Sequence, residues 1–478
     1  MGPLTDVEWP DDMGLGVLQP EDLTDAPVDH ILEALAFKPH GYPDVPTELW
    51  HKIRARPDVT YSGLQRALAR HIVRHNVPFP LSPPTEAEAK ADFLNLLSRS
   101  PVEFLGPYIE GHADYAAKYE YKHWPLDQTI AHLIRRNVGG KASNHFQQDN
   151  RFSTGGWKDA GAMIAWRDED LLAKVRWPSW VMRDGPLGNK WSSIVRLANG
   201  LYVPSPFRPS AAKAMYGWLG GAGGRILDPS CGWGDRLAAF YATPTAKLYV
   251  GCDPNGVVWR TYQDQCRTYE RWLGTADPHF QVGKISGYSA FLCRGTKDVL
   301  IVNGPFEDID WARVRDRVAP GGFDLAFTSP PYFGVERYGE GSPSEGNQSW
   351  SRYVTPDAWF EGFLLPVWET ASGLIADTGF LAINIADPGV DNVRHEVCDP
   401  MVEELVGLGM SYEGVVALAL TKRPSSGEIL GAMQADRFAE PIWMFGKGAN
   451  LPPVRVEDRE HVAEGEVDWA SLWTDERR

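Results

Sequence analysis

The chain has 478 residues, of which 43% are hydrophobic and 23% are charged, so it is long enough for two or three globular domains. Its formal net charge of −16 argues against indiscriminate nucleic-acid binding, and no apolar run approaches the roughly 20 residues that span a bilayer. The five cysteines include no C-x-x-C pair, which argues against a disulfide framework and a zinc site and favours a reducing, cytoplasmic setting.

The charge is distributed unevenly along the chain. Residues 1–50 hold one Lys or Arg against 11 Asp or Glu, residues 51–200 carry a net charge of +6, and residues 201–478 carry −12. We therefore expect an acidic arm over 1–45, a mainly helical and mildly basic domain over 46–200, an α/β domain over 201–448 and an acidic tail over 449–478. If a polyanion binds, its phosphates would meet the basic region.

The clearest helical pattern before residue 200 lies between residues 64 and 75. Leucine and isoleucine recur there every four residues, and Arg66, Arg70 and Arg74 recur with the same period on another face. This basic stripe could follow a phosphate backbone, although such a stripe is more often a solvated helix face. We also predict helices over 29–37, with Asp29 as N-cap, and over 127–137. The amides and aromatics of 144–152 suit contacts with base edges and stacking on bases, but such residues more often cap a loop.

From about residue 201 the pattern changes to alternating strands and helices. A helix follows Ser210 as its N-cap, and a short strand over 225–227 then leads into a loop that contains Gly232 and Gly234. The next strand, 249–252, ends in Asp253. Glycines allow a ligand to approach the backbone, and an acid at the end of the second strand can bind both hydroxyls of a ribose. The loop is neither G-x-G-x-x-G nor a phosphate-binding loop with lysine, so a nucleoside fits better than a dinucleotide.

Two further strands end in polar or rigid segments. The strand 299–302 precedes a segment whose Glu307 and Asp308 could bind the amino group of the same nucleoside. The strand 323–327 ends at Thr328-Ser329-Pro330-Pro331-Tyr332, where the two prolines must stop the strand. The loop over 333–350 lacks periodicity and is long enough to be a substrate-facing lid. Strands over 379–386, 411–421 and 440–447 would complete the sheet.

The segment 329–332 presents a hydroxyl, carbonyl groups without competing N–H groups and one aromatic ring. Acceptors at Ser329 and a proline carbonyl could hold the protons of an exocyclic amine and localise its lone pair, while Tyr332 could stack on the base. A base inside a duplex would have to be flipped out to reach it. The alternative is an ordinary diproline turn after a core strand, and the motif alone does not separate the two.

Together, residues of about 205–447 resemble the S-adenosylmethionine (SAM)-dependent DNA amino-methyltransferases that act on cytosine N4 or adenine N6, including those of phages. The resemblance implies a Rossmann-like methyltransferase sheet, mostly parallel with an antiparallel strand near its C-terminal end, beside a mainly helical N-terminal domain. It implies a catalytic segment at Ser329, Pro330, Pro331 and Tyr332. It implies that SAM is bound by Phe207, Pro209, Lys213, Asp228, Pro229, Ser230, Cys231, Gly232, Gly234, Asp253, Asn255, Glu307 and Asp308.

The resemblance implies a DNA methyltransferase that flips its target base and uses SAM. We expect no metal site. Ser at position 329 resembles the cytosine-N4 enzymes more than the adenine-N6 enzymes, and Ser230 replaces the usual Phe of the cofactor loop. One alternative is modification of RNA or of a free nucleotide, or transfer of a group other than methyl. A second is an inactive DNA-binding or decoy protein with the same fold. The target sequence and the oligomeric state stay open.

Overall fold

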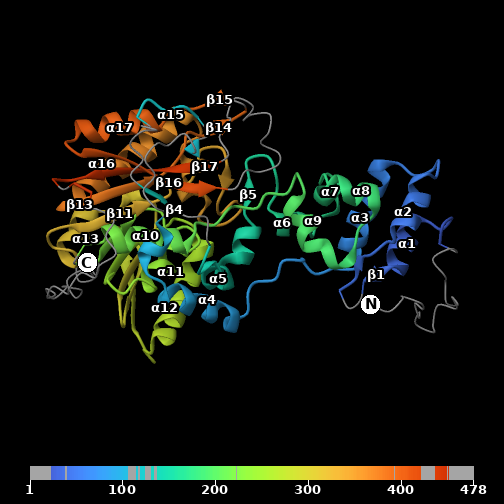
Figure 1. The fold of residues 1–478 in the computed structure, drawn as a ribbon, viewed down its shortest axis with the longest axis horizontal. Coiled ribbons are helices and arrows are strands. Elements are labelled where there is room, and N and C mark those ends of the chain that lie inside the picture. Colours follow the sequence, from blue (N-terminus) through green and yellow to red (C-terminus); the bar gives the residue numbers. More distant parts are fainter. Residues whose placement is uncertain are drawn as a thin grey trace. The chain divides into compact units, whose positions relative to one another are not determined.

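The computed structural model describes residues 23–37, 40–105, 115–116, 119–123, 131–133, 137–221, 223–391, 393–420, 437–448 and 450–451 (Figure 1). The chain divides into two units, Met1–Ser82 with Asp149–Pro204 and Pro83–Gln148 with Ser205–Arg478. This division differs from the boundaries expected at residues 45 and 200. The described part of the acidic arm joins the first core through Ile31 and Leu32, and α4 (Glu86–Ser98) packs in the second unit, where the Phe93 ring stacks on Tyr269 at 5.1 Å.

The first unit is mainly helical around a core that contains Trp50, Leu68 and Trp191. Helix α1 begins after Pro27, so Asp29 lies in its first turn and is not the expected N-cap. Helix α3 confirms the expected periodic helix, and the Thr60 side chain caps it by accepting a hydrogen bond from the Gly63 N–H. The helices of this unit are α1 (Val28–Ala34), α2 (Thr47–Arg54), α3 (Tyr61–Arg74), α6 (Ala162–Ala165), α7 (Glu169–Leu172), α8 (Ser179–Asp184), η2 (Gly188–Lys190) and α9 (Trp191–Leu197), and its short strands are β1 (Ala36–Phe37), β2 (Tyr42–Pro43) and β5 (Gly155–Gly156).

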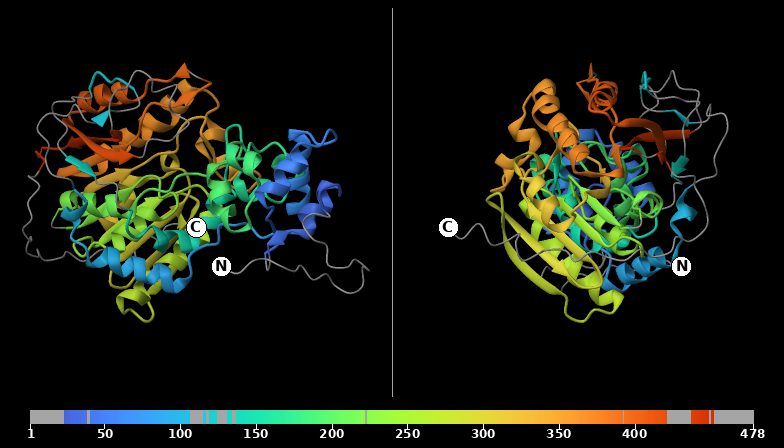
Figure 2. Two further views of the ribbon diagram at one scale, coloured as in Figure 1. Left: turned by 45° about the vertical axis from the view of Figure 1, so that its right-hand side comes forward. Right: turned by 90° about the vertical axis from the view of Figure 1, so that its left-hand side faces the viewer.

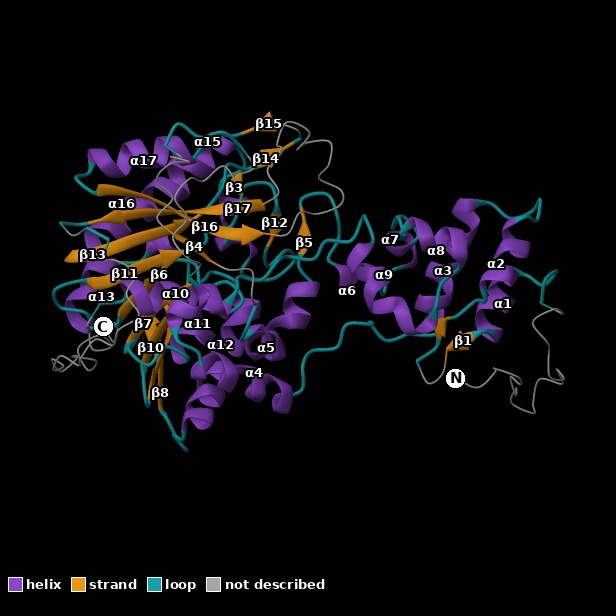
Figure 3. Ribbon diagram, viewed as in Figure 1, coloured by secondary structure: helices purple, strands orange, loops and turns teal. Residues whose placement is uncertain are grey.

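The second unit is built on a mixed sheet whose main path runs β4-β16-β17-β13-β11-β6-β7-β10-β9-β8, with β3 paired to β17 (Figure 3). Strands β13, β11, β6, β7 and β10 are parallel, and β17 pairs antiparallel with β13. The expected fold class, a mostly parallel Rossmann-like sheet with an antiparallel strand near the C-terminal end, is thereby confirmed. The strands are β3 (Tyr115–Ala116), β4 (Ala131–Leu133), β6 (Arg225–Asp228), β7 (Leu248–Cys252), β8 (His279–Ile285), β9 (Tyr288–Arg294), β10 (Asp298–Asn303), β11 (Phe323–Thr328), β12 (Glu336–Arg337), β13 (Ile375–Asn384), β14 (Gly389–Val390), β15 (Val393–Arg394), β16 (Ser411–Leu420) and β17 (Arg437–Gly446).

The central strands are apolar on both faces because helices cover both faces of the sheet. Consecutive residues such as Ile226 and Leu227, or Tyr249 and Val250, belong to two different cores. One core includes α13, α16 and α17, and the other includes α4, α10, α11 and α12. The helices of this unit are α4, η1 (Pro101–Phe104), α10 (Pro209–Leu219), α11 (Asp235–Tyr241), α12 (Gly256–Leu273), η3 (Phe306–Asp308), α13 (Trp311–Val318), η4 (Glu345–Asn347), α14 (Ser349–Arg352), α15 (Pro356–Trp359), the π-helix η5 (Phe360–Leu364), α16 (Leu365–Leu374) and α17 (Cys398–Gly407).

Several local expectations differ from the structure. Arg208 occupies the N-cap position of α10 without a side-chain hydrogen bond, and Pro209 is the first helical residue, so Ser210 lies inside the helix. Residues 144–152 belong to α5 (Gly140–Phe152) and form no capped loop. Of the expected helix over 127–137, residues 131–133 form β4, and most of the others lie outside the described residues, as do the expected tail residues 452–478. The antiparallel β8–β9 hairpin, which forms one edge of the sheet (Figure 2), was not expected.

Candidate active site

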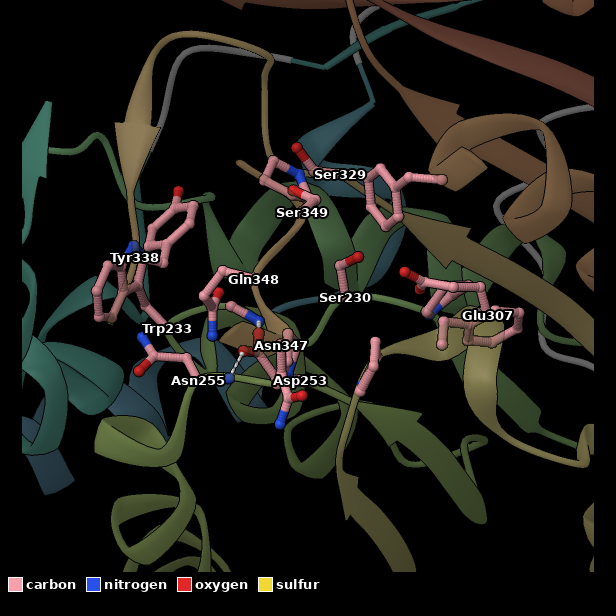
Figure 4. Close-up of a pocket in the computed structure, with 17 residues that line it drawn as sticks. Ser230, Trp233, Asp253, Asn255, Glu307, Ser329, Tyr338, Asn347, Gln348 and Ser349 are labelled. Carbon is pink, nitrogen blue, oxygen red and sulfur yellow. Dashed lines mark hydrogen bonds between the residues drawn. The ribbon is translucent and has the colours of Figure 1, made fainter. Parts of the chain in front are cut away.

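Four strand ends meet where the order of the sheet reverses. The chain passes from β6 outward to β7 and β10, then returns to β11 on the other side of β6 and continues to β13. Ligands bind outside the carboxyl ends of parallel strands at such a reversal. The loops after β6, β7, β10 and β11 line one pocket there (Figure 4), and the empty space in it, including the part open to solvent, is about 600 Å³.

The loop after β6 lines this pocket, whereas the acid that precedes it, Asp228, has a structural role. Pro229, Ser230 and Gly232 line the pocket. Asp228 does not, because its buried carboxylate accepts hydrogen bonds from Arg236 Nε at 2.7 Å and from the Tyr249 hydroxyl at 2.5 Å. Its place in this buried pair makes Asp228 a support for the loop and not a contact of the pocket.

Gly234 and Cys231 also support the loop from behind. Gly234 has φ of +70°, and a Cβ there would lie 2.2 Å from the Gln265 amide oxygen, so only glycine fits. The Cys231 thiol is buried, and burial raises its pKa well above the ordinary value. Neither residue lines the pocket.

Asp253 lies at the end of β7 with its carboxylate at the pocket (Figure 4). One oxygen accepts a hydrogen bond from the Gly232 N–H at 2.8 Å and the other from the Asn255 N–H at 2.9 Å. Burial raises the pKa of Asp253 to about 6, against the lowering effect of these two N–H groups. The carboxylate is thus fixed in place and keeps further lone pairs for two hydroxyl donors. Asn255 lines the pocket beside it and caps α12.

The segment after β10 places Glu307 at the opposite side of the pocket (Figure 4). Glu307 Oε1 accepts hydrogen bonds from Arg352 Nη1 and the Tyr353 hydroxyl, each at 3.0 Å. Burial raises the pKa of Glu307. Asp308 does not line the pocket, and its carboxylate accepts hydrogen bonds from Arg352 and the Tyr288 hydroxyl.

The corner after β11, residues 329–332, places some of its residues at the pocket and others in the core. Ser329 and Pro331 line the pocket, whereas Pro330 is buried beneath it. Tyr332 does not line this pocket. Its hydroxyl donates to Glu440 Oε1 and accepts a hydrogen bond from the Ala386 N–H at 2.9 Å. In this structure the Tyr332 hydroxyl therefore ties the corner to β17 and to the end of β13.

Three residues expected to bind the cofactor do not line the pocket. Phe207 packs its ring edge against Phe327, and Pro209 begins α10. The buried Lys213 ammonium donates to the carbonyls of Leu96 and Leu97 at 2.7 and 3.0 Å, and burial lowers the pKa of Lys213 to about 8. These two carbonyls lie in the last turn of α4, which a helix leaves without its regular N–H donors, and Lys213 supplies a donor. The sequence did not predict that α4 and Lys213 lie side by side.

The loop after the corner supplies pocket residues that the sequence alone did not identify individually. The centroids of the Trp233 and Tyr338 rings lie 5.6 Å apart. Ser344 Oγ accepts a hydrogen bond of 3.0 Å from the N–H of Gly256, the first residue of α12. The loop was expected as a lid from its length and lack of periodicity. The additional lining residues are Trp233, Pro254, Pro305, Phe306, Tyr338, Asn347, Gln348, Ser349 and Phe363.

The residues that line the pocket suit a nucleoside or a cation better than a phosphate. The described lining residues include two carboxylates, Asp253 and Glu307, and no Lys, Arg or His. Carboxylates repel phosphate and attract positive charge. In the described part of the chain, no group of three or more His, Cys, Asp or Glu side chains is arranged to hold a metal ion, and no helix combines the length and apolar character needed to cross a membrane.

The expected basic stripe on α3 is largely engaged with acids of the same unit. Arg70 pairs with Asp29 at 2.7 Å and with Glu169 at 3.3 Å, and Arg66 lies 3.8 Å from Asp170. Arg74 is exposed near the end of the helix. The stripe therefore has less free positive charge than its sequence suggests.

No family model matches this chain, and no curated protein matches it. Among solved structures, one match is a candidate S-adenosylmethionine-dependent methyltransferase from Listeria monocytogenes, which is 12% identical, with 50% of this chain and 99% of that chain covered and a TM-score of 0.28. Another is a mutant of the 16S rRNA (adenine(1408)-N(1))-methyltransferase from Catenulisporales acidiphilia with its cosubstrate SAM, which is 17% identical, with coverage of 53% and 96% and a TM-score of 0.25. At these identities and TM-scores the matches carry no conclusion about the substrate or cofactor of this chain.

Proposed function

We propose that this chain is a SAM-dependent methyltransferase that methylates the exocyclic amine of a base flipped out of DNA, with cytosine N4 favoured over adenine N6. The observation that carries the proposal is a shared pocket. Ser329 and Pro331 of the corner line the same cavity as Ser230, Gly232 and Asp253. Residues expected to bind the cofactor and residues expected to orient the amine, which lie about 100 positions apart in the sequence, therefore line one pocket.

The residues of the pocket fit the chemistry of SAM. The cofactor would supply an electrophilic methyl group on a positively charged sulfur. Asp253, held by two backbone N–H groups, is suited to accept hydrogen bonds from two ribose hydroxyls. Pro254, Pro305 and Phe306 provide apolar surface for a purine, and the loop over 229–232 offers backbone rather than bulky side chains. A pocket without basic side chains, among the residues described, favours a nucleoside sulfonium over a nucleotide.

The corner would orient the amine that attacks. Ser329 Oγ and a carbonyl of the diproline segment can accept hydrogen bonds from the two amine N–H groups and so localise the nitrogen lone pair toward the methyl group. The bound cofactor would supply the methyl group and keep the electron pair of the broken carbon–sulfur bond on its sulfur, while Ser329 and the carbonyl orient the amine, whose extra proton would pass to solvent. Catalysis is then mainly orientation, because no covalent intermediate on the protein is required. The five buried cysteines therefore need no role in the reaction.

The test is incorporation of label from methyl-tritiated SAM into unmodified duplex DNA by the full chain, followed by mass spectrometry of the nucleosides. We expect N4-methylcytosine or N6-methyladenine, and we expect Ser329→Ala to lower the turnover rate roughly 100-fold, the size of effect that one positioned hydrogen-bonding group gives in a transition state. Ser98→Ala, at an exposed serine on α4, is the matched control.

Label in RNA or free nucleotides but not in DNA would establish the first alternative, as would a modified amine that carries another group. Binding of both SAM and DNA without turnover would establish the inactive alternative. A Ser329→Ala enzyme as active as the control would contradict the assigned role of the corner.

A further inference from the structure

The two carboxylate oxygens of Glu307 differ in their hydrogen bonds. Oε1 accepts two hydrogen bonds, from Arg352 and Tyr353, whereas Oε2 is buried and has no hydrogen-bond partner among the described residues. A buried carboxylate oxygen without a donor is costly, so such an atom in a pocket wall points to a ligand that supplies the donor. Glu307 lines the pocket, and its side chain is only 8% exposed.

Arg352 holds this carboxylate in place from α14. It is the last residue of α14, which begins at Ser349 in the pocket wall. Its guanidinium bridges two acids: Nη1 lies 3.0 Å from Glu307 Oε1, and Nη2 lies 3.0 Å from Asp308 Oδ1. Asp308 is held in turn by the Tyr288 hydroxyl at 2.6 Å. The planar fork of arginine fixes orientation as well as charge, which lysine would not do.

We propose that Arg352 is a positioning residue that keeps Glu307 ionised and directs its free oxygen at the amino group of the cofactor's adenine. This inference rests on the proposed function, because it assumes an adenine nucleoside in the pocket. Arg352 itself touches no ligand and acts only through Glu307. The consequence is selectivity: an ionised carboxylate accepts from the 6-amino group of adenine and repels the 6-oxygen of hypoxanthine.

Several groups titrate near Glu307 and must be separated in a test. Arg352 and the Tyr353 hydroxyl face Glu307 directly, Asp308 adjoins it, and Tyr288 faces Asp308. Asp253 lies in the same pocket with its pKa raised to about 6, and it stays present in every variant compared. The informative quantity is therefore the difference between two ligands in one protein, since the contribution of Asp253 to ribose binding is common to both.

The experiment is calorimetric titration of the full chain with S-adenosylhomocysteine and with its deaminated counterpart S-inosylhomocysteine, between pH 6 and pH 8. The wild-type chain should prefer the adenine ligand by at least tenfold. Arg352→Gln should weaken the adenine ligand by roughly tenfold, the scale of one hydrogen bond to a charged group, and should leave the inosine ligand nearly unchanged.

In the Arg352→Gln variant, the preference for S-adenosylhomocysteine over S-inosylhomocysteine should also become smaller as the pH falls from 8 to 6. Without its guanidinium partner Glu307 takes up a proton at a higher pH, and the protonated acid can donate to the hypoxanthine oxygen. Compared with Arg352→Gln, Arg352→Lys should restore part of the preference for the adenine ligand, because lysine restores the positive charge but not the planar guanidinium. Arg315→Gln, which removes an arginine paired with Asp316 on α13, is the matched control and should behave as wild type.

The outcomes separate this inference from the proposed function. A wild-type chain that binds neither ligand would overturn the cofactor site itself. A wild-type chain that binds both ligands equally would leave the site standing and overturn the role of Glu307. Equal weakening of both ligands by Arg352→Gln at every pH would show a purely structural arginine and overturn the inference, as would no change at all.

Discussion

Asp253 is the residue whose charge should govern cofactor affinity near neutral pH. Its folded pKa is raised to about 6, so the carboxylate that accepts hydroxyl donors is nearly fully present at pH 7.5 and mostly protonated at pH 5.5. Because only the ionised form can accept from two hydroxyls, the affinity for S-adenosylhomocysteine should fall roughly fourfold between these values, the ratio of the ionised fractions. Titration calorimetry across this range measures it. Asp253→Asn should bind more weakly at pH 7.5 and lose most of this dependence, and a dependence of unchanged size in that variant would contradict the assignment.

Tyr332 should affect turnover without affecting cofactor binding. Its hydroxyl is shared between Glu440 and the Ala386 N–H, and burial raises its pKa well above the ordinary value. Tyr332→Phe leaves that N–H and the carboxylate without this partner, so the corner bearing Ser329 loses its anchor. We expect a tenfold to 100-fold lower kcat, because small displacements of positioning groups are costly, and an unchanged affinity for S-adenosylhomocysteine. A parallel loss of cofactor affinity would place Tyr332 in the cofactor site instead.

At the scale of elements, the end of α11 depends on one buried ammonium group. Lys297 Nζ donates to the carbonyls of Phe240 and Ala246 at 3.0 and 2.7 Å and also to that of Thr243. Lys297→Met would leave three carbonyls without this donor while keeping a similar side-chain volume. The carbonyls of Phe240 and Thr243 still accept from the N–H groups of Thr243 and Ala246, so the carbonyl of Ala246 is the one left without a donor. We expect a loss of about 1–3 kcal/mol in the free energy of unfolding, the cost of one buried unsatisfied carbonyl. Urea denaturation measures it, and a loss below about 0.5 kcal/mol would show that water replaces the lysine.

The elements that sequence predicted well are those whose signal is local. The glycine loop, Asp253 and the diproline corner each follow an apolar run, and parallel pairing brings such strand ends to one edge of the sheet. The failures depend on distant partners. Lys213 resembled a cofactor residue in sequence, yet it caps α4 more than 100 residues earlier in the chain. Gln348 and Ser349 line the pocket, but the sequence around them has no periodicity that would predict this. The role of Arg352 could not be predicted either, because it depends on the contact with Glu307.

At the scale of the whole molecule, the proposed binding of DNA by a chain with a net charge of −16 requires local positive charge. On α3 that charge is reduced, because Arg70 is held between Asp29 and Glu169. A change of Arg70 to Glu would set three carboxylates together, so loss of DNA binding in such a variant would not distinguish contact from unfolding. Arg70→Ala should cost about 1 kcal/mol of stability, as expected for partly exposed pairs, and is the variant that reports on structure.

Arg74 is the residue of the stripe that tests DNA contact, since it is exposed and its removal breaks no ion pair with Asp29 or Glu169. If α3 follows the phosphate backbone, Arg74→Ala should weaken binding to all duplex sequences alike and should reduce the slope of log affinity against log salt by about one, the release of a single counterion. Fluorescence anisotropy with a labelled duplex at several salt concentrations measures the slope. Lys174→Ala removes one exposed charge elsewhere in the same unit and is the control. Because phosphate neutralisation is local, equal slopes for the two variants and the wild type would exclude α3 as the DNA-contacting helix and would move the search to other surfaces of the chain.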